Sequence, residues 1–175
     1  REFILEEEQQ HLCCYCEKRI SSIADKSHLE HIRPQDKFPA LIDTYKNISV
    51  SCQTNNTCGK AKKNSFSDDF IVPTEDDPTK YLTHSPHGEI ISIQNNDKGD
   101  YTIKLLNLNA PKLTKARRKL FIELDHMKDE IEDFEKYFNE FPTLINYFKE
   151  TIALKKIFIH KPLKTGLFTS GKTKP

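Results

Sequence analysis

Four of the five cysteines in this chain form two spaced pairs, in the stretches CCYC (13–16) and CQTNNTC (52–58). Thiolate sulfur is a preferred ligand of Zn²⁺, and two such pairs separated by a few dozen residues are typical of a tetrahedral structural site. The odd total, in a chain that we expect to be cytoplasmic, disfavours a disulfide framework. We therefore expect one structural zinc ion, held by Cys13, Cys16, Cys52 and Cys58.

Two other interpretations of the cysteines stay open. All five can be small buried hydrophobic residues. A single C-x-x-C can also serve redox chemistry, although the second pair argues against that here. Cys14 is the spare residue, because Cys14-x-Cys16 is a poorer chelate than a C-x-x-C turn, and we assign it to packing or to a free thiol.

A second group of reactive residue types lies between the cysteine pairs, in the stretch SHLEHIRP (27–34). Histidine is a common general base, so the His31 imidazole can take a proton from water. Glu30 offers the hard oxygen ligand that Mg²⁺ or Mn²⁺ prefers. Adjacent strand residues face opposite ways, so the two can share a site only if the strand bends or ends there, which Pro34 favours. The alternative is that both are ordinary exposed strand residues.

A small ββα unit would have to position these groups. HLEHI (28–32) and ISVSC (48–52) have strand character, and the residues between them, 35–47, are expected to form a loop. GKAKKNSF (59–66) is expected to begin a helix. A metal-held unit suits a segment that is too short to be stabilised by burial alone. A short helix over residues 1–12 is expected to lead into the first cysteine pair.

The combined pattern resembles the HNH endonucleases, whose fold is the ββα-metal finger. The matching pieces are Cys13/Cys16, Glu30-His31-Ile32-Arg33-Pro34, Asn47-Ile48, Cys52 and Cys58-Gly59-Lys60-Ala61-Lys62. With LLNLNAPKLTKARR (105–118), the resemblance extends over about residues 11–120 to the HNH subfamily found beside an ATPase in the Septu anti-phage system and in some retrons.

The resemblance implies metal-dependent hydrolysis of DNA phosphodiester bonds in an anti-phage defence complex. It implies that His31 is the general base, that Glu30 binds a catalytic Mg²⁺ or Mn²⁺, and that Asn47 holds the loop and orients the base. An ATPase partner is implied, and no G-x4-G-K-[ST] motif occurs in this chain, so ATP hydrolysis would belong to another protein. The helix lysines are equally consistent with phosphate contact and with a solvated face: Lys60, Lys62 and Lys63.

One position departs from the family pattern. HNH proteins usually carry His or Asn just after the last cysteine as a second metal ligand, and this chain has Gly59. Water or a nearby side chain would have to replace it: His28, Asn55, Asn56 or Asn64. The departure keeps a second function class open, a catalytically silent zinc-containing module that delivers a partner to nucleic acid. RNA as the substrate is a third possibility.

The remaining chain predicts an α+β protein in three parts: 1–70, the HNH unit; 71–110, a loop and a β-hairpin; and 111–175, a helical hairpin with an extended tail. The hairpin is expected from GEIISI (88–93) and DYTIKLLNLN (100–109). An apolar stripe predicts one long helix from Pro111 to Phe138, mostly facing the core and in part available to a partner. A second helix is expected from Pro142. No apolar run is long enough to span a bilayer, so no membrane association is expected.

Overall fold

The first sheet consists of two antiparallel strands, β1 (Ser27–His31) and β2 (Ile48–Cys52), followed by the helix α1 (Cys58–Lys62). The computed structural model describes residues 1–23, 25–129 and 133–159. The register pairs Ser27 with Cys52 at one end of the sheet and His31 with Ile48 at the other. Both predicted strands are thus confirmed, and the predicted helix is present but ends at Lys62.

A short N-terminal helix, Ile4–Glu8, packs on this sheet, as predicted. Ile4 and Leu5 are buried against Val50 of β2. The Gln9 side chain then covers the outer edge of β2, because its amide oxygen accepts from Val50 N at 2.8 Å and its amide nitrogen donates to Val50 O at 2.9 Å. These two bonds satisfy backbone groups that an edge strand would otherwise leave unpaired.

The second sheet pairs β3 (Leu82–His84) with β4 (Ile90–Ser92). The hairpin predicted in this region is therefore present with a different partner strand, since residues 82–84 were expected to be loop. Most of the expected second strand, residues 100–106, lies instead in α2 (Asp97–Leu106). The reason is the Asn96 side chain, which accepts from Lys98 N and Gly99 N and so caps the helix.

The C-terminal part consists of α3 (Pro111–Met127) and α4 (Pro142–Ile159), which pack together. The prediction of one helix through Phe138 is wrong, because α3 ends at Met127. Phe134 and Phe138 come from the segment that returns towards α4, and they join the same apolar cluster as Leu120 and Leu124. The apolar residues therefore keep a spacing of three and four positions although they belong to two separate elements, α3 and the segment that follows it. Ile131 of that stripe, and the tail from residue 160, lie outside the described residues.

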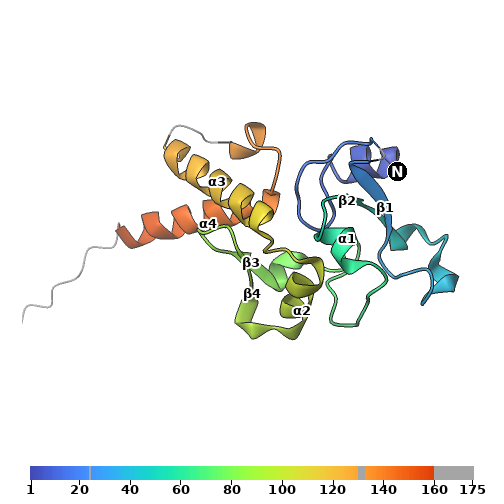
Figure 1. Cartoon of the computed structure of the whole chain (residues 1–175). Coiled ribbons are helices and arrows are strands. Elements are labelled where there is room, and N and C mark those ends of the chain that lie inside the picture. The colour runs from blue at the N-terminus through green and yellow to red at the C-terminus, as the bar shows by residue number, and fades with distance from the viewer. Residues whose placement is uncertain (24, 130–132, 160–175) are drawn as a thin grey trace, which may run out of the picture.

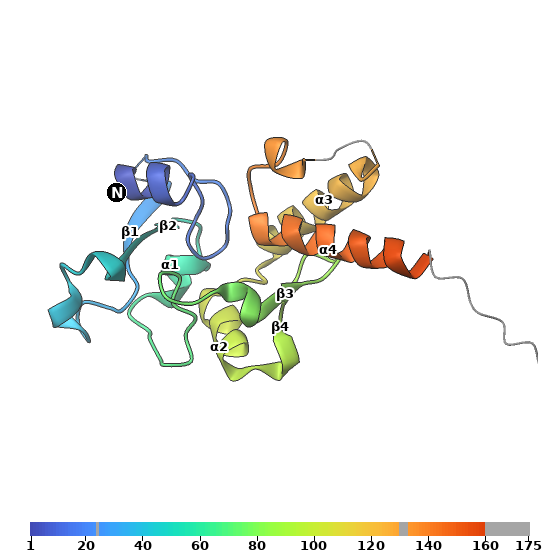
Figure 2. The same ribbon diagram turned by 180° about the vertical axis from the view of Figure 1, so that it is seen from behind.

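Figure 1 shows the β1–β2–α1 unit at one end of the molecule and the α3–α4 pair at the other, with β3, β4 and α2 between and below them; Figure 2 shows the same arrangement from behind. A hydrophobic cluster joins the first unit to the middle part, since Cys13, Cys16 and Tyr15 pack with Phe70 and Leu106. Residues from the predicted parts 1–70 and 71–110 thus share one core.

Hydrogen bonds also fix the helical pair to the rest of the chain. The Arg117 guanidinium is fully buried and donates to Gly88 O at 3.1 Å and to Leu108 O at 2.8 Å. At the start of α4, Phe141 N donates to Glu17 O at 3.0 Å, and the Thr143 hydroxyl donates to a Glu17 carboxylate oxygen at 2.7 Å. The two ends of the molecule are therefore connected through the residue that follows Cys16.

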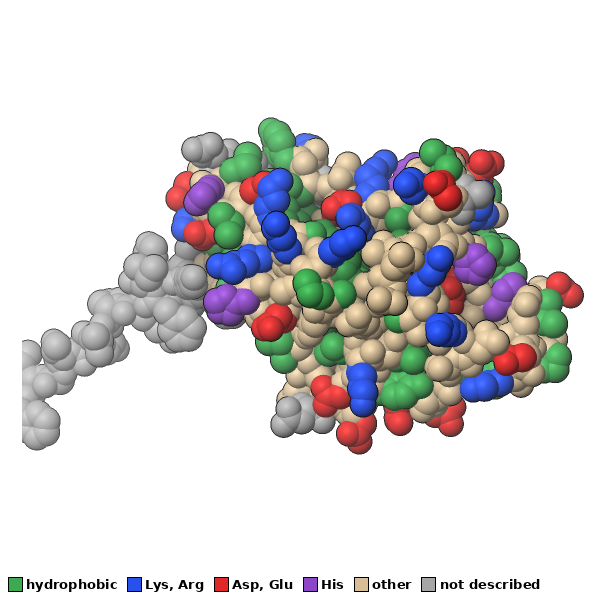
Figure 3. All heavy atoms as spheres, in the orientation of Figure 1, with side chains coloured by type: hydrophobic (Ala, Val, Ile, Leu, Met, Phe, Trp, Pro, Cys, Tyr) green, Lys and Arg blue, Asp and Glu red, His purple; other side chains and the backbone are tan. Residues whose placement is uncertain are grey.

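Charged side chains are unevenly distributed over the surface. In Figure 3, Asp and Glu side chains gather along the lower edge, whereas Lys and Arg side chains lie across the middle and upper parts of this face. Among the described residues, none of the helices has the length and apolar character that crossing a bilayer requires.

Candidate functional site

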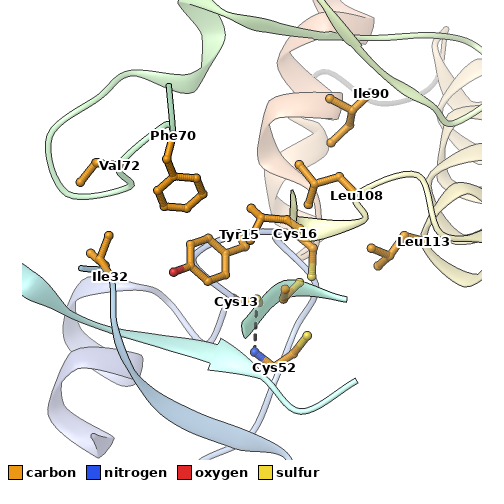
Figure 4. Packing of buried hydrophobic residues seen from close by; sticks show 12 residues of the cluster. Cys13, Tyr15, Cys16, Ile32, Cys52, Phe70, Val72, Ile90, Leu108 and Leu113 are labelled. Carbon is orange, nitrogen blue, oxygen red and sulfur yellow. Dashed lines mark hydrogen bonds between the residues drawn. The ribbon is translucent and has the colours of Figure 1, made fainter. Parts of the chain in front are cut away.

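The four predicted zinc ligands lie together in the structure. The sulfur atoms of Cys13, Cys16, Cys52 and Cys58 all lie within 4.8 Å of one another, and all four residues are buried. A tetrahedral site with Zn–S bonds of about 2.3 Å places its sulfurs about 3.8 Å apart, so the cluster has the dimensions for one zinc ion. Figure 4 shows three of these residues, Cys13, Cys16 and Cys52, beside Tyr15.

Local structure explains why these sulfurs converge. Cys13 and Cys16 lie in a tight turn in which Glu17 N donates to Cys13 O at 3.0 Å and Cys13 N donates to Lys18 O at 2.9 Å. Cys52 ends β2, and Cys58 begins α1. The four predicted zinc ligands therefore come together from three places in the chain: the 13–16 turn, the end of β2 and the start of α1.

The cluster also favours thiolate at its centre. Burial alone would raise the pKa of the Cys13 thiol, but neighbouring cysteine thiols donate to its sulfur and hold that pKa well below the usual value. Cys52 N adds a backbone hydrogen bond to Cys13 Sγ at 3.3 Å. The pKa of Cys14 is raised, first by burial and then by Cys13, and Cys14 does not belong to the four-sulfur group.

Glu30, the predicted ligand of the catalytic metal, lies next to this cluster with only 5% of its surface exposed. Oε1 accepts from Lys62 Nζ at 3.0 Å and from the Tyr15 hydroxyl at 3.2 Å. Oε2 accepts from the Ser51 hydroxyl at 3.1 Å. The carboxylate is therefore oriented by three donors, of which Tyr15 and Ser51 were not expected from the sequence.

Lys62 does not lie where a phosphate could reach it. Its side chain is buried, and Nζ contacts Glu30, the His31 carbonyl oxygen at 3.3 Å and the Lys63 carbonyl oxygen at 3.5 Å. The predicted nucleic-acid contact of Lys62 thus disagrees with the structure, because its charge is used to neutralise a buried carboxylate. Lys60 and Lys63 are exposed, and for them the prediction stands as made.

His31 is half-buried at the last position of β1. Its Nε2 lies 3.1 Å from the Ile42 carbonyl oxygen and 3.1 Å from the Gln35 amide nitrogen. A protonated Nε2 can donate to the carbonyl, and an unprotonated Nε2 can accept from the amide. The ring therefore has a partner in either state, which suits a group that takes up and releases a proton.

His31 and Glu30 line the same cavity although they are adjacent in a strand. The cavity has a volume of about 300 Å³, and its wall includes both residues together with His28, Pro34, Gln35, Asp36, Gly59, Lys63 and Asn64. His31 is the last residue of β1, and at a strand end two adjacent side chains need not point to opposite faces of the sheet. An imidazole and a carboxylate thus line one cavity.

Asn47 ties down the loop that follows β1. Its side-chain oxygen accepts from Arg33 N at 2.8 Å, and its amide nitrogen donates to Arg33 O and to Leu41 O, each at 3.1 Å. Asn47 is 2% exposed and does not form part of the cavity wall. It acts on the backbone on both sides of the loop that carries Gln35.

Gly59 leaves the space that the Glu30 carboxylate uses. A Cβ at this position would lie 2.3 Å from Glu30 Oε2 and 2.6 Å from Ser51 Oγ. Of the substitutes that the sequence offered, His28 and Asn64 line the cavity, whereas Asn55 lines a different groove. Asn64 donates to an Asp36 carboxylate oxygen at 3.1 Å, which places a second acid at the cavity wall.

The residues present fit a Mg²⁺ or Mn²⁺ ion held mainly by water. Oε2 of Glu30 has one donor and faces the space above Gly59. Mg²⁺ keeps several waters and is commonly bound through one or two carboxylates with substrate phosphates. Within the described ranges, the cysteine cluster is the only group of three or more His, Cys, Asp or Glu residues drawn together, so a catalytic ion would depend on Glu30.

The fold and the site define a mixed α+β chain with a four-cysteine cluster that is compatible with zinc. The cluster lies where a two-stranded sheet meets a short helix, beside a cavity lined by a histidine and a carboxylate. No family model matches the chain.

Two known proteins are similar to it in sequence. The chain is 30% identical over 98 residues to Septu protein PtuB of Bacillus thuringiensis, covering 55% of this chain and 36% of that protein. It is 26% identical over 153 residues to Septu protein PtuB of Bacillus mycoides (strain KBAB4), covering 69% of this chain and 50% of that protein. The chain is therefore PtuB-like, and it spans half or less of the length of these relatives.

Proposed function

We propose that this chain is a metal-dependent endonuclease of the HNH type that cleaves DNA in an anti-phage defence complex. The observation that carries the proposal is the shared cavity of Glu30 and His31 beside the four-cysteine cluster. The order β1–β2–α1, with cysteines before β1, at the end of β2 and at the start of α1, supports an assignment to the ββα-metal fold. Similarity to Septu protein PtuB supports the defence role.

In the proposed reaction, His31 accepts a proton from a water molecule whose oxygen forms a bond to phosphorus. The bond from phosphorus to the 3′ oxygen breaks and the leaving oxygen takes a proton from solvent water, so that the products are a 5′-phosphate and a 3′-hydroxyl. The Ile42 carbonyl oxygen then accepts a hydrogen bond from the protonated ring. A divalent ion, when bound, supplies charge neutralisation at the phosphate and at the leaving oxygen.

Other residues of the chain position these groups. Glu30 is set by Lys62, Tyr15 and Ser51 so that one oxygen faces the cavity. Lys63, at the cavity wall, can contact a substrate phosphate. Asn47 keeps the 33–41 loop closed behind His31. We include an ATPase partner in the proposal, because the relatives are Septu proteins and the chain carries no nucleotide-binding signature of its own.

A second candidate function has one observation in its favour. The Glu30 carboxylate already has three donors, and Gly59 supplies no side chain for a second metal ligand. A zinc-containing module that binds DNA and a partner without cleaving would retain the same fold.

A plasmid-nicking assay with Mg²⁺ or Mn²⁺, with and without the partner ATPase, separates the two candidates. We expect cleavage by the wild-type chain and at least a hundredfold loss in His31→Ala, since general-base catalysis contributes about 10²–10⁴-fold. His87→Ala is the matched control, because His87 is an exposed histidine on the turn between β3 and β4. Absence of cleavage by the wild-type chain with any metal, with the ATPase present, would favour the silent module.

A further inference from the structure

A large open groove lies at the end of the first sheet opposite His31. Its volume is about 750 Å³, and its wall is formed by the zinc turn, the β1 and β2 ends and the start of α3: Lys18, Arg19, Ile20, Ser21, Asp25, Lys26, Cys52, Gln53, Thr54, Asn55 and Lys112. The mechanism proposed above uses none of the groove's side chains.

The groove is positively charged. Four exposed cations line it, Lys18, Arg19, Lys26 and Lys112, against the single acid Asp25. A carboxylate oxygen of Asp25 lies 4.0 Å from Lys26 Nζ. Within the part of the chain that the structure describes, the other three cations form no ion pair, so their charges are available to a ligand.

The positive surface continues along α3. Lys112, Lys115 and Lys119 are exposed and recur at steps of three and four residues, which places them on one face of the helix. Lys119 is paired with Glu123 at 3.4 Å, whereas Lys112 and Lys115 have no such partner among the described residues. The Lys and Arg side chains across the middle and upper parts of Figure 3 agree with a broad basic face.

The groove and the catalytic cavity lie at opposite ends of β1. Lys26, the turn residue that precedes β1, lines the groove, while His28, Glu30 and His31 of β1 line the cavity. From Lys26 to His31 the chain advances about 17 Å at 3.4 Å per residue. That length corresponds to roughly five steps of a DNA strand at 3.4 Å each.

We propose that this groove binds the phosphate backbone of the DNA substrate roughly five nucleotide steps from the cleaved bond. The inference rests on the proposed function and adds the direction in which the substrate leaves the cavity. It also assigns α3, which lies outside the ββα unit, to substrate binding through Lys112. Phosphate is the ligand because the groove presents four exposed cations together with the side-chain amides of Gln53 and Asn55.

The test compares two variants with equal loss of charge. The groove variant carries K18Q, R19Q, K26Q and K112Q, and the control variant carries K80Q, K104Q, K128Q and K136Q, all exposed lysines outside the groove. Binding to a labelled 30-base-pair duplex is measured by fluorescence anisotropy at several salt concentrations, in buffer without added Mg²⁺ or Mn²⁺ and without a chelator that would remove zinc. Because the proposed cleavage needs an added divalent ion, the result is independent of whether the chain is a nuclease; zinc content is checked before and after each titration.

We expect the groove variant to bind at least tenfold more weakly, and its slope of log affinity against log salt to fall by about 0.9 for each lost phosphate contact. The control variant should change little. A paired variant, K26Q with K112Q, should show an intermediate loss if the larger variant folds poorly. Equal losses in both variants, or normal DNA binding by the groove variant with loss of the partner ATPase, would overturn the proposal.

Cleavage adds a second readout if the nuclease is active. On a duplex that ends within three base pairs of the cut on either side, groove and control variants should cleave alike. On a 30-base-pair duplex only the groove variant should be slower. A groove variant that is slower on both substrates by the same factor would contradict binding at a distance from the cut.

Discussion

The Glu30 carboxylate packs so closely against Gly59 that a methyl group on residue 59 would clash with it, because a Cβ there would lie 2.3 Å from Glu30 Oε2. The residue that departs from the HNH pattern is thus the one that makes room for the Glu30 carboxylate.

Gly59→Ala tests this relationship. Alanine favours a helix over glycine by about 1 kcal/mol, yet the new methyl would meet Glu30 Oε2 and Ser51 Oγ. We expect the clash to dominate and to lower the free energy of unfolding by about 1–3 kcal/mol, measured by urea denaturation. Lys60→Ala, the exposed neighbour in α1, is the control and should change stability little. A Gly59→Ala protein as stable as wild type would show that Glu30 can move aside.

The buried Lys62–Glu30 pair predicts strong non-additivity. Lys62→Met leaves the carboxylate without its cation in a buried site, which should cost about 3–5 kcal/mol of stability. Adding Glu30→Gln should restore part of that loss, with a coupling energy of about 1–3 kcal/mol in the double-mutant cycle. The coupling energy is obtained from the unfolding free energies of the wild type, the two single variants and the double variant. Simple additivity of the two losses would argue against the ion pair.

The four-sulfur cluster predicts unequal effects for neighbouring cysteines. We expect about one zinc per purified chain. Cys16→Ser should lose the metal and unfold the β1–β2–α1 unit, because binding energy is folding energy in such sites. Cys14→Ser should keep both zinc and thermal stability, since Cys14 lies outside the cluster. Elemental analysis with circular dichroism measures both, and equal zinc loss in the two variants would contradict the assignment.

His84 predicts a loss of stability in mild acid. Burial, followed by the nearby Arg117 charge, lowers the pKa of His84 to about 4 from an ordinary value of 6.5. Below pH 6.5 the unfolded chain takes up a proton that the folded chain refuses until about pH 4. Stability therefore falls as pH drops through that window, by up to about 3 kcal/mol.

Urea unfolding of wild type and His84→Gln at pH 7, 6 and 5 isolates this contribution, because the carboxylates titrate in both proteins. Wild type should lose stability faster than the variant between pH 6.5 and 5. Parallel pH profiles would show that His84 protonates freely in the folded state.

Sequence patterns predicted the parts of this molecule in which chemistry and spacing coincide. The cysteine pairs were recognisable because thiolate ligation restricts both residue type and distance, and the two strands of the first sheet followed from their alternation. The burial of Lys62 was not predictable in this way, since a lysine on a short helix is usually exposed, and only the fold brings Glu30 beside it.

Two errors have a common physical origin. Residues 100–109 contain Thr and Ile, which favour strands, but the Asn96 cap and the packing of Leu106 make residues 100–106 helical. The stripe from Leu113 to Phe138 kept a helical spacing while the chain turned back after Met127. Short-range patterns record which residues meet the core, and tertiary contacts decide which element carries them there.

Glu17 gives the molecule a mechanical property. It follows Cys16 directly and receives three hydrogen bonds from the beginning of α4, at 3.0 Å from Phe141 N, 3.2 Å from Thr143 N and 2.7 Å from Thr143 Oγ1. Because the turn that Glu17 follows carries two of the four sulfurs, a load on α4 would reach that turn through these three bonds, alongside the packing of α4 on α3 and β3.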